Sequence, residues 1–283
     1  MSLKITILGC GSSGGVPRIG NIWGACDPQN PRNRRRRCSI LVERAGAEGT
    51  TTVLVDTSPD MRAQLLDANV TWLDGVIYTH EHADHTHGID DLRMVAINGK
   101  RQVDTYMSTA TAELVMSRFS YCFQTPEGSP YPAILRQHTL YQDRLLMVNG
   151  AGGPVVTLPF EQRHGHIDSL GFRFGSIAYS CDLSDMPDSS LYALEDLDVW
   201  IVDALRYTPH PSHFNVEATL RWIDRIKPKR AIITNMHVDL DYETLRRELP
   251  DGVEPAYDGM ILETHAELPE QLAKAAGKPV QDI

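Results

Sequence analysis

The sequence lacks several features that would place it in a specialised class of protein. No stretch of about 18 apolar residues occurs, so no transmembrane helix is predicted. The N-terminus has too short an apolar run for a secretory signal peptide. The five cysteines are scattered and form no CxxC pair, which is typical of a reducing compartment rather than a disulfide framework. We therefore expect a cytoplasmic protein.

An excess of positive charge is also absent. The formal net charge is −10, because 37 acidic residues outnumber 27 basic ones. An acidic surface repels phosphate backbones and anionic lipids, so extended nucleic acids and membranes are not expected as partners. Hydrophobic residues make up 42% of the chain and charged residues 23%, which is ordinary for a globular protein with a core of its own.

A glycine-rich loop follows the first predicted strand, Lys4–Leu8. Gly9, Gly11 and Gly14 form a G-x-G-x-x-G pattern. A dinucleotide site would need a helix to begin at this point, with its N-terminus toward the pyrophosphate. Further glycine and proline residues follow up to position 20 instead, without helical periodicity. We therefore expect a loop whose backbone passes close to a pocket.

Strands and helices alternate along most of the chain. The clearest predicted strands are at 39–43, 52–56, 76–78, 155–158, 171–174, 177–179, 197–202 and 230–233, and the clearest predicted helices are at 59–69, 89–98, 109–119 and 216–226. This alternation indicates a layered α/β fold. We predict a single domain over residues 1–283, with an irregular insertion at about 120–140 and a polar tail after about 266.

Four metal-binding side chains follow the short buried strand at 76–78. His80, His82, Asp84 and His85 lie within six residues, at the end of a strand where α/β proteins usually form their sites. The imidazoles of His80 and His82, two residues apart, can bind one cation, and Asp84 and His85 can bind a second. Imidazole and carboxylate ligands suit Zn²⁺, Mn²⁺ or iron. The alternative, an exposed histidine-rich loop, does not explain this spacing.

The segment Thr79–His85, followed by Gly88, resembles the H-x-H-x-D-H signature of the metallo-β-lactamase superfamily. Within it, the chain is similar to the phosphoribosyl cyclic phosphodiesterase branch, which is associated with phosphonate breakdown. The likeness spans nearly the whole chain and includes the opening glycine loop, the arginines before Cys38-Ser39, and Tyr257-Asp258-Gly259-Met260. It implies a four-layer αβ/βα sandwich that holds two divalent metal ions, Zn or Mn, at one edge.

The resemblance also implies how the first metal ion is held. His80 and His82 would bind it together with a histidine further along the chain. His164 and His166 are the candidates, and we prefer His164 because the branch usually has His-Gly at this point.

The second metal ion would be held by Asp84 and His85, with Asp182 bridging the two ions. Asp84 is therefore also a catalytic candidate. The last ligand departs from the family pattern, because the family usually has Thr-His where this chain has Thr234-Asn235. We assign His237 to that role, with the alternative that Asn235 occupies the ligand position and His237 lies behind it.

Two further features concern the substrate. By the same resemblance, His213 would act as a general acid or phosphate contact. The basic segment Arg32/Arg34–Arg37 is either a solvated loop or a source of bidentate phosphate ligands, for which we select Arg36 and Arg37. The remaining histidines, His87, His138, His210 and His265, are expected to be ordinary surface or core residues.

These features predict a phosphodiesterase that acts on a small cyclic or nucleotide-like phosphodiester through a metal-bridging hydroxide. The expected partner is a small phosphorylated substrate, and a homodimer is an open alternative to a monomer. A tRNA-processing nuclease of this fold would carry a long basic arm, which we do not find. A thioester or lactone hydrolase would not need the arginine cluster. The third alternative is a non-catalytic nucleotide-binding module.

Overall fold

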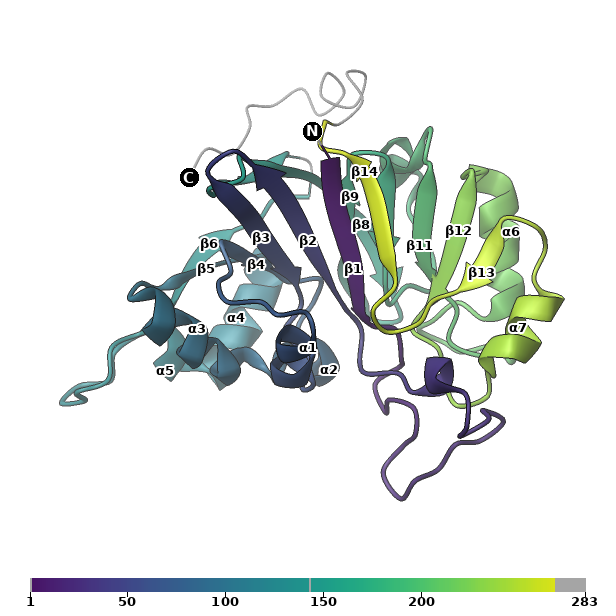
Figure 1. Cartoon of the computed structure of the whole chain (residues 1–283), viewed down its shortest axis with the longest axis horizontal. Helices are drawn as coiled ribbons and strands as arrows, with labels where there is room; N and C mark the ends of the chain where they lie inside the picture. Colours follow the sequence, from purple (N-terminus) through teal and green to yellow (C-terminus); the bar gives the residue numbers. More distant parts are fainter. Residues whose placement is uncertain (1, 143, 268–283) are drawn as a thin grey trace.

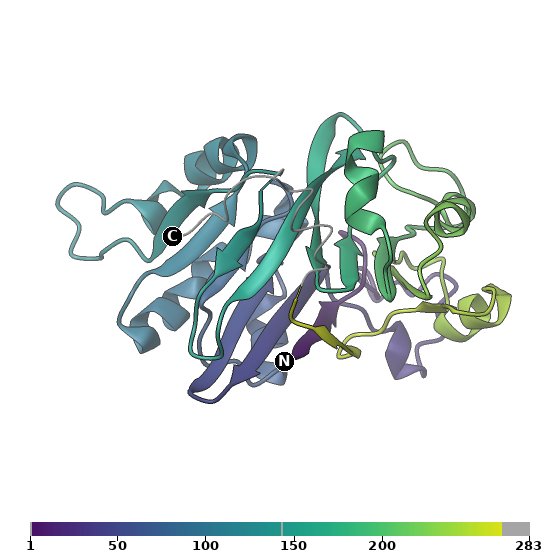
Figure 2. The ribbon, with the colours of Figure 1, turned by 90° about the horizontal axis from the view of Figure 1, so that it is seen from above.

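Two seven-stranded sheets lie face to face in the computed structural model, which describes residues 2–142 and 144–267. Helices cover the outer face of each sheet, so that the layers run helix, sheet, sheet, helix (Figures 1 and 2). This is the predicted four-layer αβ/βα sandwich. It buries both faces of each sheet, as a layered fold must.

The first sheet contains the histidine signature. Its strands, in spatial order, are β14 (Ile261–His265), β1 (Ser2–Gly9), β2 (Ser39–Gly46), β3 (Gly49–Val55), β4 (Gly75–Ile77), β5 (Val103–Met107) and β6 (Leu135–Thr139). The strands from β14 to β3 pair antiparallel, and those from β3 to β6 pair parallel. The carboxyl ends of β3 and β4 therefore lie side by side.

The second sheet has the same mixture of pairings. Its strands, in spatial order, are β13 (Val253–Pro255), β12 (Arg230–Thr234), β11 (Val199–Asp203), β10 (Ile177–Ser180), β9 (Ile167–Phe174), β8 (Val155–His164) and β7 (Leu146–Val148). The strands from β10 to β13 are parallel, so the residues that follow β10, β11 and β12 meet at one edge.

Short helices connect these strands. Those on the first sheet are α1 (Met61–Asp67), α2 (Ala83–Thr86), α3 (Leu92–Gly99), α4 (Thr109–Arg118) and α5 (Ser120–Phe123), and those on the second are α6 (Val216–Ile226) and α7 (Tyr242–Glu248). Three 3-10 turns are η1 (Pro31–Asn33), η2 (Ile89–Asp91) and η3 (Asp188–Leu194). Helix α6 begins and ends at the predicted residues, because Asn215 caps its N-terminus and Lys227 turns left-handed after it.

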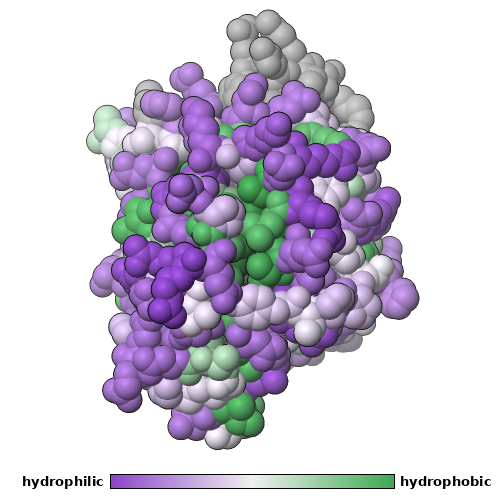
Figure 3. Space-filling view, turned by 90° about the vertical axis from the view of Figure 1, so that its right-hand side faces the viewer, coloured by the Kyte–Doolittle hydropathy of each residue, from purple (hydrophilic) through white to green (hydrophobic). Residues whose placement is uncertain are grey.

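The core is divided among the layers. Its largest cluster lies between the sheets and joins side chains such as Ile5, Val42 and Phe172. Of two other clusters, one lies between the first sheet and its helices and the other lies between the second sheet and its helices. On the side that carries α6 and α7, a strip of apolar surface is surrounded by hydrophilic side chains (Figure 3).

The glycine loop has the role expected of it. No helix begins after β1. The backbone of Gly11 instead bridges to Arg37 and to Met236, which links the loop to the ends of both sheets. A Cβ atom at Gly9 would lie 2.0 Å from the carbonyl oxygen of Arg37, so only glycine allows this close approach.

The predicted insertion is shorter than expected. Within the segment of about 120–140, α5 and β6 are regular, and only residues 124–134 lack helix or strand. The predicted tail after about 266 falls outside the described residues, except for residue 267. Among the described residues, no helix is both long and apolar enough to cross a membrane.

Candidate metal centre

The histidine signature leaves the first sheet directly after β4. His80 and His82 lie in the loop, and α2 carries Asp84 and His85. Asp56, at the end of β3, accepts hydrogen bonds of 2.8 Å from both the backbone N–H and the hydroxyl of Thr79. A carboxylate from the neighbouring parallel strand therefore fixes the start of the loop.

Residues from both sheets form the first predicted ligand set. One nitrogen or oxygen atom from each of His80, His82, His164 and Asp182 lies within 4.8 Å of all the others. His164 ends β8, and its Nε2 lies 3.2 Å from Nδ1 of His82. The structure thus brings His164 to the cluster, while His166 is exposed.

Neighbouring groups orient these imidazoles. Nδ1 of His80 lies 2.9 Å from the Thr79 hydroxyl, and Nδ1 of His164 donates to the carbonyl oxygen of Ser212 at 2.7 Å. These contacts direct the Nε2 atoms toward Asp182, at 3.6 Å in each case. Such contacts on the far nitrogen are typical of histidine ligands.

The second predicted set surrounds His85. Its Nδ1 bonds to Asp56 at 2.7 Å, and its Nε2 lies 3.5 Å from Asp84 and 3.4 Å from Asp182. The same Oδ2 atom of Asp182 also faces His80 and His164. Asp182 therefore lies between the two sets.

The carboxylates and imidazoles of the two sets shift one another's pKa values. Burial holds the pKa of His80 well below its usual value, and the charge of His85 lowers it further. Burial would also lower the pKa of His85, but Asp182, Asp84 and Asp56 outweigh it and raise that pKa. A divalent cation would replace the proton on His85 and be held by the same carboxylates.

The assignment of His237 to the second set requires correction. Its ring lies on another wall of the cavity, where Nε2 contacts the Arg18 guanidinium and Nδ1 lies 3.0 Å from Asp239. The residue that reaches the centre is Asn235, whose side-chain N–H donates to Asp182 at 2.7 Å. Asn235 adopts a left-handed backbone (φ 60°) after β12, which turns its side chain toward Asp182 and carries the chain away before position 237.

His213 lies beside the ligand sets, as predicted. Its Nδ1 bonds to the buried Asp203 at 2.9 Å, and its ring is 4.7 Å from that of His164, centroid to centroid. Burial would lower the pKa of His213, but the charge of Asp203 and the hydrogen bond to it raise the pKa to about 9. His213 therefore lines the cavity with a pKa that favours its protonated form.

The predicted phosphate role of Arg36 is not supported by its position. Arg36 is paired with Asp258 at 3.1 Å and with Asp67 at 2.8 Å, which ties the loop to the fold. Arg37 pairs with Asp60 and lines a neighbouring hollow that also includes Asp84. The basic segment therefore acts mainly as a structural link.

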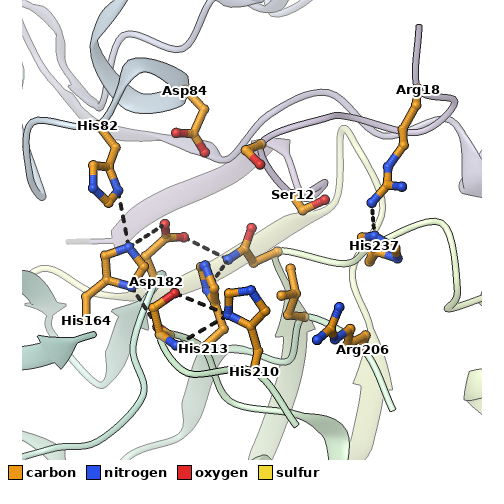
Figure 4. A pocket seen from close by; sticks show the side chains of 14 residues that line it. Ser12, Arg18, His82, Asp84, His164, Asp182, Arg206, His210, His213 and His237 are labelled. Carbon is orange, nitrogen blue, oxygen red and sulfur yellow. Dashed lines mark hydrogen bonds and ion pairs between the residues drawn. The ribbon is translucent and has the colours of Figure 1, made fainter. Parts of the chain in front are cut away.

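A cavity of about 390 Å³ opens over the two ligand sets (Figure 4). Besides the predicted residues, its lining includes Ser12, Arg18, Arg206 and His210. None of these four was assigned to the site from the sequence, and His210, expected to be an ordinary surface or core residue, lies in the cavity wall. Arg18, Arg206 and His210 lie on irregular segments with no motif, whereas Ser12 belongs to the glycine loop, which was expected to pass close to a pocket.

The residues fit a metal centre. Nε2 of His80 and Nε2 of His85 are buried, have no hydrogen-bond partner among the described residues, and face Asp182. Buried polar atoms are rarely left without a hydrogen-bond partner. Two such nitrogens that face the same carboxylate therefore indicate a ligand between them. Imidazole and carboxylate donors are those of zinc and other first-row divalent ions.

Comparison with known proteins identifies the family. A model of the beta-lactamase superfamily domain matches residues 51–236, which include the signature, Asp182 and Asn235. The chain belongs to the beta-lactamase superfamily. It is thus a hydrolase of the metallo-β-lactamase fold, as the histidine signature predicted.

Two solved structures are similar to this chain over most of its length. The structure of a new diphosphatase from the PhnP family is 33% identical, with a TM-score of 0.82, and the match covers 94% of this chain and 100% of that one. Zn²⁺-bound PqqB from Methylobacterium extorquens is 17% identical, with a TM-score of 0.70, and covers 92% of this chain and 99% of its own. At that identity the likeness concerns the fold alone.

One curated relative is named for a transferase activity rather than for a hydrolase activity. An octanoyltransferase of Porphyromonas gingivalis is 29% identical over 263 residues, which are 91% of this chain and 51% of that protein. This superfamily member therefore spans about half the length of the curated relative that it matches.

Proposed function

We propose that this chain is a metal-dependent phosphodiesterase that acts on a small, nucleotide-like phosphodiester. The observation that carries the proposal is the arrangement around Asp182, where two sets of imidazole and carboxylate groups share one carboxylate beneath a cavity. Paired sites of this kind recur in phosphatases and nucleases. The 33% identical diphosphatase supports a phosphorus-centred reaction.

Two divalent ions, Zn or Mn, are proposed as cofactors. His80, His82, His164 and Asp182 would hold the first, and Asp84, His85, Asp182 and the Asn235 side chain would hold the second. When bound, such ions activate water and neutralise charge on phosphoryl oxygens. The protein would contribute a fixed geometry, because Thr79, Asp56 and Ser212 orient the imidazoles.

His213 and Asp203 would handle the proton of the leaving group. His213 faces the cavity in its protonated form, since Asp203 stabilises the charge. A donor placed beside the scissile bond can protonate the departing alkoxide, which is an assistance of about 10²- to 10⁴-fold in rate. Asp203 would act by positioning His213 rather than by touching the substrate.

An acyl transfer through a cysteine nucleophile receives less support from this cavity. None of the residues lining it is a cysteine that could carry the acyl group, and Cys181 is fully buried. The octanoyltransferase likeness covers only half of that protein, so the named activity is not carried over.

A substrate panel tests the proposal. Protein loaded with Zn²⁺ or Mn²⁺ is assayed on bis(p-nitrophenyl) phosphate, an acyl thioester and a lactone. We expect the phosphodiester to give the highest kcat/KM. Asp182→Ala should lower it by on the order of 10²- to 10³-fold or more, whereas Asp188→Ala, whose side chain is 86% exposed, should not. Dominant turnover of the thioester or the lactone would contradict the proposal.

A further inference from the structure

Asn235 is a weak donor for the second proposed metal set. Its side-chain N–H is directed toward Asp182 at 2.7 Å, and its amide oxygen faces the thiol of Cys38 at 3.8 Å. An amide N–H donates hydrogen bonds only, and the amide oxygen is a weaker zinc ligand than an imidazole. Asp84, His85 and Asp182 therefore need one further strong donor to complete a four-coordinate site.

Cys181 lies beside this incomplete set. It follows the last residue of β10 and immediately precedes Asp182, whose left-handed backbone (φ 53°) turns the chain at the edge of the sheet. Its Sγ donates to Oδ1 of Asp182 at 3.0 Å. One donor atom from each of His85, Cys181 and Asp182 lies within 4.8 Å of the other two. From this spacing a single ion can contact all three side chains.

An unpaired buried nitrogen lies in the same group. Nε2 of His85 has no hydrogen-bond partner among the described residues, and the side chain is only 1% exposed. This nitrogen lies 3.4 Å from Asp182 and 3.5 Å from Asp84. A buried polar atom without a partner is rare, and this one is surrounded by a thiol and two carboxylates, which are the donors of a zinc site.

The other cysteines do not share these neighbours. All five cysteines are buried, and a buried thiol ordinarily packs as a small apolar group. Cys122, for example, lies in the cluster between the first sheet and its helices, where its thiol faces Asp90 at 3.9 Å. Among the residues that the structure describes, Cys181 is the one cysteine grouped with histidine and carboxylate donors. Its neighbours, rather than its burial, distinguish it.

We propose that Cys181 is a ligand of the second metal ion, together with Asp84, His85 and Asp182. The metal–sulfur bond would form as the S–H bond breaks and its proton passes to solvent, because a coordinating thiol is deprotonated. A thiolate is a soft donor, which favours zinc over manganese. The inference rests on the two-ion part of the proposed function, and it narrows the second ion to zinc.

Cobalt spectroscopy tests the ligand. Chelator-stripped protein is titrated with Co²⁺, which gives a sulfur-to-cobalt charge-transfer band in the near ultraviolet only when a thiolate is bound. We expect this band to develop as the second site fills. Cys181→Ser should lose the band and lower the Zn²⁺ affinity of the second site by at least about 10- to 100-fold, the range for groups that merely orient a ligand. Cys122→Ser removes a thiol that is also fully buried, and it should change neither the band nor the affinity.

The wild-type protein can also be tested without any variant. X-ray absorption at the zinc edge of the two-zinc protein should show a sulfur atom about 2.3 Å from zinc. Absence of that sulfur, or a charge-transfer band that persists in Cys181→Ser, would overturn the inference. A band that is lost in Cys38→Ser and kept in Cys181→Ser would make Cys38 the ligand instead.

The same measurements separate this inference from the proposed function. If bis(p-nitrophenyl) phosphate is not hydrolysed but the band and the zinc–sulfur distance are found, the phosphodiesterase function fails and the ligand assignment is supported. If a protein with two zinc ions and no sulfur neighbour hydrolyses the phosphodiester, the function is supported and the assignment of Cys181 fails.

Discussion

Asp56 contacts two parts of the histidine signature at once. It accepts two hydrogen bonds from Thr79 and one from Nδ1 of His85, and it is fully buried. Burial raises its pKa, while the charge of His85 opposes that rise. A buried carboxylate is retained only where partners compensate its desolvation. Asp56 therefore prepares the ligand set without lining the cavity.

Asp56→Asn should weaken metal binding without removing any predicted ligand. The amide keeps the size of the side chain but loses the charge that orients His85. We expect the affinity for Zn²⁺ to fall by about 10- to 100-fold, as measured by competition with a chromogenic chelator. Asp67→Asn, at a site that is 70% exposed, is the matched control. An unchanged Zn²⁺ affinity in a folded Asp56→Asn protein would refute the positioning role.

Asn235 is the point at which the chain departs from the family pattern. Its amide is a weaker ligand for zinc than an imidazole, so the second site should bind more weakly than the first. Asn235→His should raise the affinity of the second metal ion about tenfold or more, seen as a second equivalent by mass spectrometry of metal content after dialysis. If the wild type and Asn235→His retain the same number of metal ions per chain after dialysis, position 235 does not contact the second ion.

Helix α7 fastens the loop that precedes β2. Asp241, its N-cap, accepts hydrogen bonds from the backbone of Thr244 at 2.9 Å, the side chain of Asn33 at 2.7 Å and the backbone of Asp27 at 3.1 Å. Burial would raise the pKa of Asp241, but these hydrogen bonds lower it to about 2. One capping carboxylate thus joins a helix of the second sheet to the irregular segment near Arg18.

The pKa of Asp241 predicts a dependence of stability on pH. Its folded value lies below the unfolded value of about 3.9, so its contribution is fully present above about pH 4 and is lost as the pH falls toward 2. Asp241→Ala should lower the free energy of unfolding by about 1–2 kcal/mol at pH 7. Asp241→Asn should keep the helix cap and should lose less unfolding free energy than the wild type as the pH falls, as measured by urea denaturation at several pH values. The same loss of unfolding free energy in both proteins would contradict the role of the charge.

The elements nearest the signature could be predicted from the sequence, whereas the far wall of the cavity could not. His80 to His85 follow one strand, so their proximity is set locally. His164 and Asp182 were found through the resemblance. Arg18 follows the glycine loop, where Gly11 bridges to Met236 across more than 200 residues, and no local pattern encodes such a contact. Strands β5, β6, β7, β13 and β14 were missed because each has five residues or fewer, and all of them except β7 are of mixed polarity.

The two sheets share one core, and this determines how the whole molecule should unfold. Phe172 of β9 is fully buried in the cluster that also contains Ile5 and Val42 of the first sheet. Phe172→Ala should therefore cost about 3–5 kcal/mol and lower the stability of both sheets together. Urea denaturation followed by tryptophan fluorescence and by circular dichroism should give one shared transition. Two separated transitions would show that the sheets unfold independently.

The sandwich also determines where chemistry occurs in the molecule. The parallel strands of both sheets end at the same edge, so Asp56 and His80 from one sheet meet Asp182, Asp203 and Asn235 from the other. Three of these, Asp56, Asp182 and Asn235, have a left-handed backbone, with φ between 53° and 64°. Strain of this kind is maintained where the surrounding fold demands a particular side-chain direction.

The central claim is that this shared edge is a metal centre which hydrolyses phosphodiesters. It is tested most directly by titrating chelator-stripped protein with Zn²⁺ or Mn²⁺ while following bis(p-nitrophenyl) phosphate hydrolysis and bound metal together. We predict that activity rises with occupancy, reaches its maximum at two ions per chain and is absent from Asp182→Ala at every metal concentration. Activity in the stripped protein, or full activity in Asp182→Ala, would contradict the account.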